Sequence, residues 1–373
     1  MTSIPNGLTS PSQKNDGGTG ATERLIADYA RPLWQRWLIS RETAVIASLI
    51  IVAIVASVVV QNFGTTVTLG FLLLDAVPIL LIALPMTLVI VSGEIDLSVA
   101  STLGLSCVML GVLTKAGWPI EAAMVACLVV GLLAGAVNGF LVTVVGLPSL
   151  AVTIGTLALF RGIAVGLLGT TAITDFPIEW QNLVQERFGA TGIPVVMVLV
   201  IVLIAVFAIV LHFTPFGRGL YALGLSKDTA TFSGVNVART KFIAFLLTGV
   251  VSALAGIYWT LRYGSARGDN AIGLELSVIA AVLLGGVSIF GGKGALHGVV
   301  AGVLLIGVLQ SALRLANVSS DAINIITGAL LIVSVLSPRI LGWFSARRAA
   351  ARRTRTKSLQ YAIPTKGNND VAP

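Results

Sequence analysis

Long apolar runs separated by short polar stretches dominate the chain, and their lengths predict membrane-spanning helices. Most runs are long enough, at about 1.5 Å per residue, to cross a hydrocarbon layer of roughly 30 Å. They are too long and too uniformly apolar for outer-membrane strands of about 10 residues, and backbone groups in lipid must be paired within their own segment, so we predict helices. The ten predicted spans are 44–60, 72–91, 99–114, 122–145, 150–169, 194–212, 242–260, 277–290, 295–313 and 322–337.

The basic residues outside these spans predict the orientation of the chain. An even number of spans places both ends on one side. Of the 24 Lys and Arg residues, 18 lie in the tail 1–43, the loop 213–241, the glycine loop 291–294 and the tail 338–373. Because basic residues favour cytoplasmic loops, we predict that both tails are cytoplasmic and that residues 44–337 form the membrane domain.

The count of spans also suggests an internal repeat. Ten spans divide into two sets of five, and an odd number in each half makes the second half start from the opposite face. A polar, glycine-containing stretch follows the second span, Gly93–Ser98, and another follows the eighth, Gly285–Gly294. We therefore predict an all-α polytopic membrane protein with about ten transmembrane helices, arranged as two inverted halves.

Composition supports a membrane protein and excludes several other classes. The chain is 56% hydrophobic and only 11% charged, against about 25% charged in soluble domains. Its net charge of +8 lies mainly in tails and loops, without the basic and aromatic surface of a nucleic-acid-binding protein, so no nucleic-acid partner is predicted. Cys107 and Cys127 fall inside apolar runs and are interpreted as buried small side chains, and neither a metal site nor a cofactor is predicted.

Two carboxylates, Glu94 and Asp96, follow the second span in the stretch VSGEIDLSVAS. Asp96 or Ser98 can accept hydrogen bonds from the first N–H groups of the next helix, as an N-cap does. Alternatively, this hairpin lines the inner mouth of a solute path, where irregular backbone is tolerated beside water. Glu94, Asp96 and Ser98 are therefore candidates for a path or gate.

Two further charges lie inside predicted spans, Asp75 near the outer end of the second and Arg161 in the fifth. A charge at the centre of a lipid-facing helix costs about 2.5 to 3.5 kcal/mol on insertion scales. We therefore expect both side chains to face the interior, where they pair with each other or line the solute path.

The longest cytoplasmic loop carries a candidate docking element. Gly224 and Gly234 bracket the segment SKDTATFSG, in which Ser226 is a plausible N-cap and Asp228 lies in the first turn. We predict a short helix along the membrane surface, either as a solvated connector or as a docking element for a cytoplasmic partner.

The glycine-rich stretch GGVSIFGGKG, Gly285–Gly294, does not fit a phosphate-binding loop. The spacing of its glycines is wrong, and Lys293 is followed by Gly294 instead of Ser or Thr. No ATP site and no catalytic residues are predicted, and the glycines are better explained by close backbone approach between helices.

Three motifs in order resemble the membrane permease subunits of ATP-binding cassette importers for monosaccharides, the ribose-type branch. They are IALPMTLVIVSGEIDLSVAS, GRGLYALGLSKDTATFSGVNV and LLGGVSIFGGKG, and the similarity runs from about Ala44 to Ser337. LVIVSG, STLGL and YGSARGDNA look most like rhamnose-type and autoinducer-2-type permeases.

The resemblance implies that the chain passes a sugar-like solute inward across a bacterial cell membrane. It also implies three kinds of partner: a cytoplasmic ATP-binding subunit that supplies energy, an extracytoplasmic solute-binding protein, and a second permease copy or a sister permease.

The resemblance also assigns a coupling element, the segment Ser226 to Gly234, which is expected to sit in a cleft of the ATPase. Ala230 and Phe232 are the expected apolar contacts, with Lys227 and Asp228 at the rim. The whole expected coupling set is Gly224, Ser226, Lys227, Asp228, Thr229, Ala230, Phe232 and Gly234. The chain departs from the family pattern where Glu94, Ala100 and Leu225 replace glycines.

The alternative is an ion-coupled secondary transporter of a small polar solute. It would need an intramembrane acid near the midplane, whereas Asp75, Glu94 and Asp96 lie near span ends. No His or Cys cluster in the sequence supports a membrane-embedded enzyme. We therefore predict a transport subunit without its own ATPase site.

Overall fold

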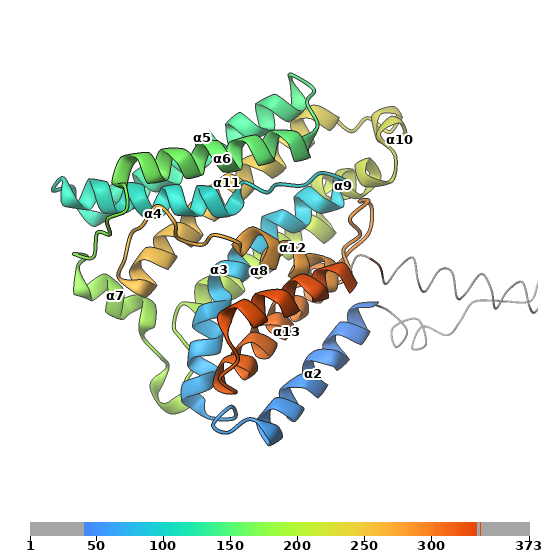
Figure 1. Cartoon of the computed structure of the whole chain (residues 1–373). Helices are drawn as coiled ribbons and strands as arrows, with labels where there is room; N and C mark the ends of the chain where they lie inside the picture. The colour runs from blue at the N-terminus through green and yellow to red at the C-terminus, as the bar shows by residue number, and fades with distance from the viewer. Residues whose placement is uncertain (1–40, 334–335, 337–373) are drawn as a thin grey trace, which may run out of the picture.

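The computed structural model describes residues 41–333 and residue 336 as a bundle of helices (Figure 1). The predicted tails lie outside the described residues, apart from residues 41–43. Within the described part there is no β-strand, only two isolated bridges. The helices are α2 (Arg41–Val59), α3 (Thr66–Val91), α4 (Val99–Lys115), α5 (Ile120–Thr143), α6 (Ser149–Leu168), α7 (Ile178–Gln185), α8 (Met197–Phe213), α9 (Pro215–Leu225), α10 (Lys227–Phe232), α11 (Val237–Tyr263), α12 (Leu274–Leu284), α13 (Leu296–Leu315) and an unlabelled helix, Ser320–Val333.

Each of the ten predicted spans overlaps one of these helices, although the span 277–290 runs past the end of α12 and the span 322–337 ends outside the described residues. The overlap confirms the all-helical polytopic class. Among the described residues, six helices are long and apolar enough to cross a membrane, or seven if α8 and α9 count as one span bent by 64°. The bend follows from Thr214, which accepts a hydrogen bond from the N–H of Gly217 and ends α8 before Pro215 starts α9. Three predicted spans are shorter apolar helices: α4, α12 and Ser320–Val333.

Helix α3 forms the centre of the bundle. Every residue from Ala76 to Val91 is buried, and the helix contacts α8, α11, α12 and α13. Pro78 has no N–H to donate, so the carbonyl of Leu74 loses its helical partner. The hydroxyl of Tyr258 on α11 donates to that carbonyl at 2.7 Å. A neighbouring helix thus replaces the bond that the proline removes, where no water is available to do so.

The contact between α5 and α11 depends on glycine. A methyl group added at Gly135 would overlap the backbone of α11, and one added at Gly249 would overlap the backbone of α5. Without a large hydrophobic driving force between helices in lipid, close van der Waals contact between backbones is what stabilises such a pair.

The two halves of the chain repeat the same order of elements. The longest helices, α3 and α11, have 26 and 27 residues, and each is followed by a non-helical stretch and a shorter apolar helix. α3 packs on α12 and α13, while α11 packs on α4 and α5. This pattern supports two inverted halves. In this arrangement the stretch after α11, Gly264–Gly273, corresponds to the stretch after α3, Gly93–Ser98. The sequence suggested Gly285–Gly294 as the counterpart instead, and that pairing is wrong because Gly285–Gly294 follows the next helix, α12.

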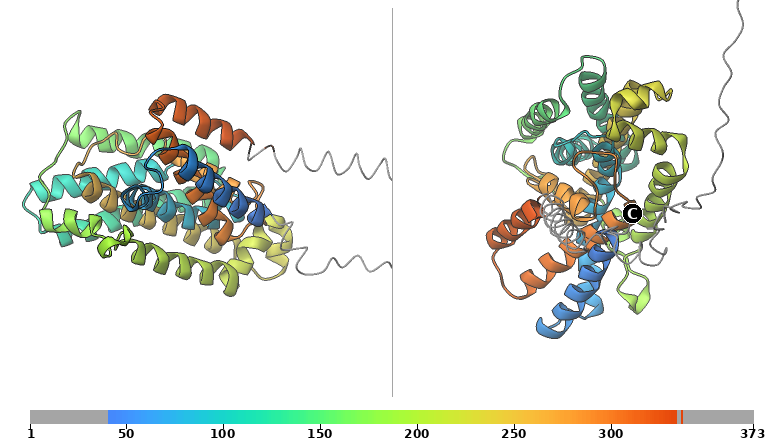
Figure 2. Two further views of the ribbon diagram at one scale, coloured as in Figure 1. Left: turned by 90° about the horizontal axis from the view of Figure 1, so that it is seen from below. Right: turned by 90° about the vertical axis from the view of Figure 1, so that its right-hand side faces the viewer.

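The ends of the bundle are marked by the two shortest α-helices. Figures 1 and 2 show α10 at one end and α7 at the other, and both the start of α2 and the end of the described chain lie toward α10. We call these the α10 end and the α7 end. α3 runs from the α7 end to the α10 end, and α11 runs back.

Candidate functional site

Helix α10 projects from its end of the bundle and presents one aromatic side chain. Ser226 caps it, because its hydroxyl accepts a hydrogen bond from the N–H of Thr229 at 3.2 Å, which confirms the predicted short helix and its cap. Phe232 is 92% exposed. Ala230 is fully buried against the chain's own residues, so the expectation that it contacts a partner is wrong. The other members of the predicted coupling set on this helix, Lys227, Asp228 and Thr229, are exposed.

Directly behind α10, three stretches of backbone cross with no side chain between them. Gly224, near the end of α9, lies against Val91 at the end of α3 and against Gly292. The N–H of Gly292 donates to the carbonyl of Val91 at 2.9 Å. A methyl group at Gly291 would lie 2.9 Å from the Cα of Gly224 and 3.0 Å from that of Gly93. We call Gly93, Gly224, Gly291 and Gly292 the glycine junction.

A tyrosine side chain also holds the glycine-rich loop at the junction. The hydroxyl of Tyr221 on α9 donates to the carbonyl of Gly294 at 2.6 Å, which fixes the glycine-rich loop to the helix that leads into α10. The predicted close backbone approach in this loop is therefore confirmed. No side chain separates the backbone of α9, which leads into α10, from the end of α3 and the loop after α12.

The hairpin between α3 and α4 is held by side chains from three elements. Asp96 accepts hydrogen bonds from the N–H of Ser98 at 2.9 Å and from its hydroxyl at 2.7 Å. The amide of Asn138 on α5 donates to the Ser98 hydroxyl at 2.8 Å. Burial raises the pKa of Asp96 to about 6. The expectation that Asp96 or Ser98 caps α4 is wrong. Asp96 accepts its hydrogen bonds from Ser98, which precedes α4, and no side chain caps the first turn of that helix.

Glu94 ties this hairpin to the start of α11 through an ion pair with Lys241. The left-handed backbone conformation falls on Gly93, with φ of +85°, and not on Glu94 or Ala100. The two side chains that replace the glycines of the family pattern therefore adopt ordinary backbone geometry. Glu94 directly follows Gly93 of the glycine junction, and Asp96 and Ser98 lie farther along the same stretch, where Ser98 contacts α5.

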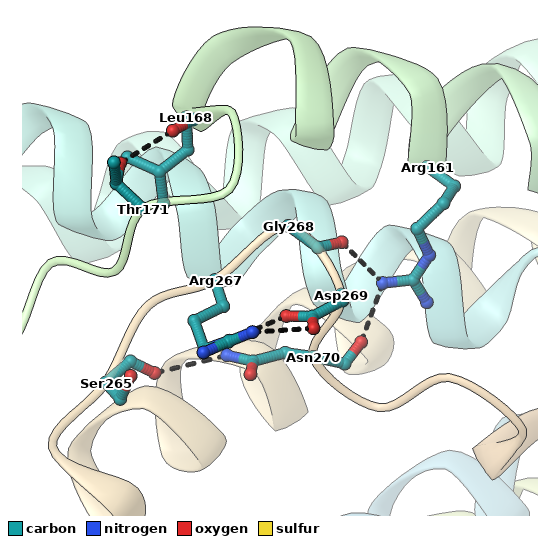
Figure 3. A network of polar contacts seen from close by, with 8 residues as sticks. All are labelled: Arg161, Leu168, Thr171, Ser265, Arg267, Gly268, Asp269 and Asn270. Carbon is teal, nitrogen blue, oxygen red and sulfur yellow. Dashed lines mark hydrogen bonds and ion pairs between the residues drawn. The ribbon is translucent and has the colours of Figure 1, made fainter.

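Arg161 on α6 holds a second non-helical segment, 264–273, which runs between α4 and α6 (Figure 3). Its guanidinium donates to the carbonyls of Gly268 at 2.8 Å and Asn270 at 2.7 Å, and to that of Ala100 on α4 at 3.2 Å. Carbonyls outside a helix need a donor from the protein when lipid surrounds the bundle. Arg161 supplies two of these bonds, to Gly268 and Asn270, and its third bond goes to a carbonyl inside α4.

Asp75 on α3 pairs at the α7 end with two arginines and not with Arg161. Its carboxylate lies 3.3 Å from a guanidinium nitrogen of Arg314 on α13 and 3.7 Å from one of Arg262 on α11. The expectation that Asp75 and Arg161 face inward is confirmed, and the expectation that they pair with each other is wrong, because the packing of the helices gives each of them nearer partners.

Asp75 lines a cavity of about 450 Å³ between α3, the end of α11, the start of α12, α13 and the helix Ser320–Val333. Its polar and aromatic lining includes Asp75, Trp259, Tyr263, Gln310, Arg314 and Thr327. Of these, the sequence identified only Asp75. The available signal was the presence of polar side chains such as Gln310 and Thr327 inside the ninth and tenth apolar spans.

Comparison with known proteins gives one family and a consistent group of relatives. Residues 68–335 match the family described as branched-chain amino acid transport system / permease component. The chain is 35% identical over 330 residues to the autoinducer 2 import system permease protein LsrD of Salmonella paratyphi A, covering 85% of this chain and 98% of that protein. It is 37% identical over 272 residues to the LsrD protein of Photorhabdus luminescens, covering 71% and 81%. No solved structure matches.

The role of Arg161 can be tested by stability. Arg161→Met should lower the unfolding temperature of the purified protein clearly, because the non-helical carbonyls of Gly268 and Asn270 lose a charged donor and each such loss costs about 1 to 3 kcal/mol. Arg267→Gln is the control, since Arg267 pairs with Asp269 on the exposed side of the same segment and an exposed pair contributes about 0 to 1 kcal/mol. Equal effects of the two substitutions would contradict the assigned role.

Proposed function

The chain belongs to the permease family described above and is the membrane subunit of an importer; we propose that its solute is sugar-like, either autoinducer-2 or a monosaccharide such as rhamnose or a ribose-like pentose. The observation that carries this proposal is the similarity to autoinducer-2 import permeases, which extends over 98% of one relative. The family description names branched-chain amino acids instead, so the class of solute has to be tested directly.

The energy comes from a separate cytoplasmic ATP-binding subunit that binds α10. Two features support this assignment. Phe232 is almost fully exposed on a capped helix that projects from the bundle, which suits an aromatic anchor in a partner's cleft. The glycine junction behind it then carries the motion of α10 into α3 and α12. An extracytoplasmic binding protein and a second copy or sister permease complete the assembly.

An ion-coupled transporter is less compatible with the three acids that lie near the ends of the predicted spans, Asp75, Glu94 and Asp96. A coupling acid must bind and release its ion during each cycle. Asp75 is held by two arginines and Glu94 by Lys241, while Asp96 is hydrogen-bonded inside a hairpin at one end of the bundle. None of these three lines the middle of a path.

The α10 end is proposed to face the cytoplasm of a bacterium. Within the described residues the loops at the two ends carry five basic residues each, so these loops do not favour either end as the cytoplasmic one. The two tails carry another 13, and the described chain begins and ends toward α10. The positive-inside rule then places both tails and α10 in the cytoplasm.

Cysteine labelling tests this orientation. The native Cys107 and Cys127 are buried and give little background. In cells with a permeabilised outer envelope, an impermeant thiol reagent should modify Asn182→Cys, on α7, and should modify Ser233→Cys only after lysis. Labelling of Ser233→Cys in intact cells, with protection of Asn182→Cys, would reverse the assigned topology.

Uptake measurements test the solute class. Cells that express the permease with its ATPase and binding protein should accumulate labelled autoinducer-2, rhamnose or ribose, and cells without the permease should not. Labelled leucine should not accumulate above background. Import of leucine alone would show that the proposed solute class is wrong.

The coupling role of α10 predicts a specific loss. Phe232→Ala should lower solute-stimulated ATP hydrolysis by the assembled complex at least about thirtyfold, because truncating a buried aromatic anchor costs about 2 kcal/mol or more. Lys227→Ala, on the exposed first turn of the same helix, should have a much smaller effect. Both variants should insert normally. A larger effect of Lys227→Ala would place the interface elsewhere on the helix.

A further inference from the structure

The cavity at the α7 end carries charged and hydrogen-bonding side chains among apolar ones. Its walls come from both halves of the chain: Asp75 lies in the first half, and Trp259, Gln310 and Thr327 lie in the second. A volume of about 450 Å³ is within the range of small-molecule sites. In the proposed orientation, the cavity lies on the side from which the solute arrives.

The charges that line the cavity cancel. Asp75 and Arg314 are the charged residues of the lining, and they pair with each other at 3.3 Å. A second guanidinium, that of Arg262, approaches Asp75 from outside the lining. A solute ammonium would have to compete with two guanidiniums for one carboxylate, and a solute carboxylate would have to detach Arg314 from Asp75. The cavity therefore disfavours an amino acid and accepts an uncharged solute without breaking the pair.

The rest of the polar lining consists of neutral hydrogen-bonding groups beside aromatic rings. The rings of Trp259 and Tyr263 lie with their centroids 4.9 Å apart on one side of α11. The amide of Gln310 on α13 donates to the hydroxyl of Thr327 at 3.2 Å, which links α13 to the last helix. Aromatic faces bind the C–H faces of a sugar, while amides and hydroxyls bind its hydroxyl groups.

We propose that this cavity is a solute-binding station inside the permease, specific for an uncharged, polyhydroxylated, sugar-like solute. This inference rests on the proposed function and adds a selective site within the membrane subunit itself. Two helices connect the station to the α10 end. α3 contributes Asp75 and leads to Gly93, and α12 starts at the cavity and leads into the loop of Gly291 and Gly292. Motion of α10 can therefore open or close the station.

Protection of an engineered thiol tests the station directly. Ser311 lines the cavity, and Ser311→Cys in the purified complex in lipid nanodiscs can be modified with a small neutral thiol reagent. A saturating concentration of autoinducer-2, rhamnose or ribose, whichever the cells import, should slow this modification about tenfold, whereas leucine should not. The matched control Asn182→Cys, outside the cavity, should show no protection by any solute.

Variants of one aromatic residue test the specificity of the protection. Trp259→Ala should abolish it and should lower uptake, while Trp259→Phe should retain both, because an aromatic face remains. Trp118→Ala is the control, since Trp118 is exposed at the turn between α4 and α5. Protection that survives in Trp259→Ala would overturn the assigned role of the ring.

The outcomes separate the two proposals. If the wild-type complex imports a sugar-like solute but Ser311→Cys is not protected by it, the station is refuted and the proposed function stands. If leucine is imported and protects Ser311→Cys, the proposed function fails and the cavity binds an amino acid instead of a sugar-like solute. If the imported sugar-like solute protects and leucine does not, both proposals are supported.

Discussion

The fold depends on one constraint: inside a membrane, every backbone group that leaves a helix must find its hydrogen-bond partner within the protein. Three places show how the chain meets it. Tyr258 donates to the carbonyl that Pro78 leaves free, Arg161 donates to the carbonyls of the segment 264–273, and the hydroxyls of Ser149 and Thr153 bond to the N–H and the carbonyl of Ile95 in the first hairpin. The polar residues of the interior therefore hold the irregular segments in place.

These irregular segments are what make the bundle suitable for transport. A continuous helix resists bending, whereas a break provides a point at which its two parts can move. The break at 92–98 lies beside the glycine junction at the α10 end, and the break at 264–273 lies beside the cavity at the α7 end. The two ends of the proposed path thus carry related features, one in each half of the repeat.

In the proposed mechanism, the glycine junction is the route by which α10 acts on the cavity at the opposite end. Contacts between long side chains can yield by changing rotamer, but contacts between backbones cannot. At Gly224 and Gly291 the chain has no side chain to yield, so in this mechanism α3, α9 and the loop before α13 move together. The length of α3, about 1.5 Å for each residue, carries that displacement from the α10 end to Asp75.

Features that depend on local composition could be predicted from the sequence. Apolar runs of sufficient length predicted ten of the described helices but neither α7 nor α9, Ser226 and the bracketing glycines predicted α10, and the ordered motifs indicated the family. Other features were decided only by the tertiary structure: the arginine partners of Asp75, the carbonyl partners of Arg161, the burial of Ala230 and the cavity around Trp259. Arg314 pairs with Asp75 across 239 positions of sequence. Such a partnership follows from how whole helices pack against one another, because periodicity along a helix shows which residues share a face and not which distant face lies opposite.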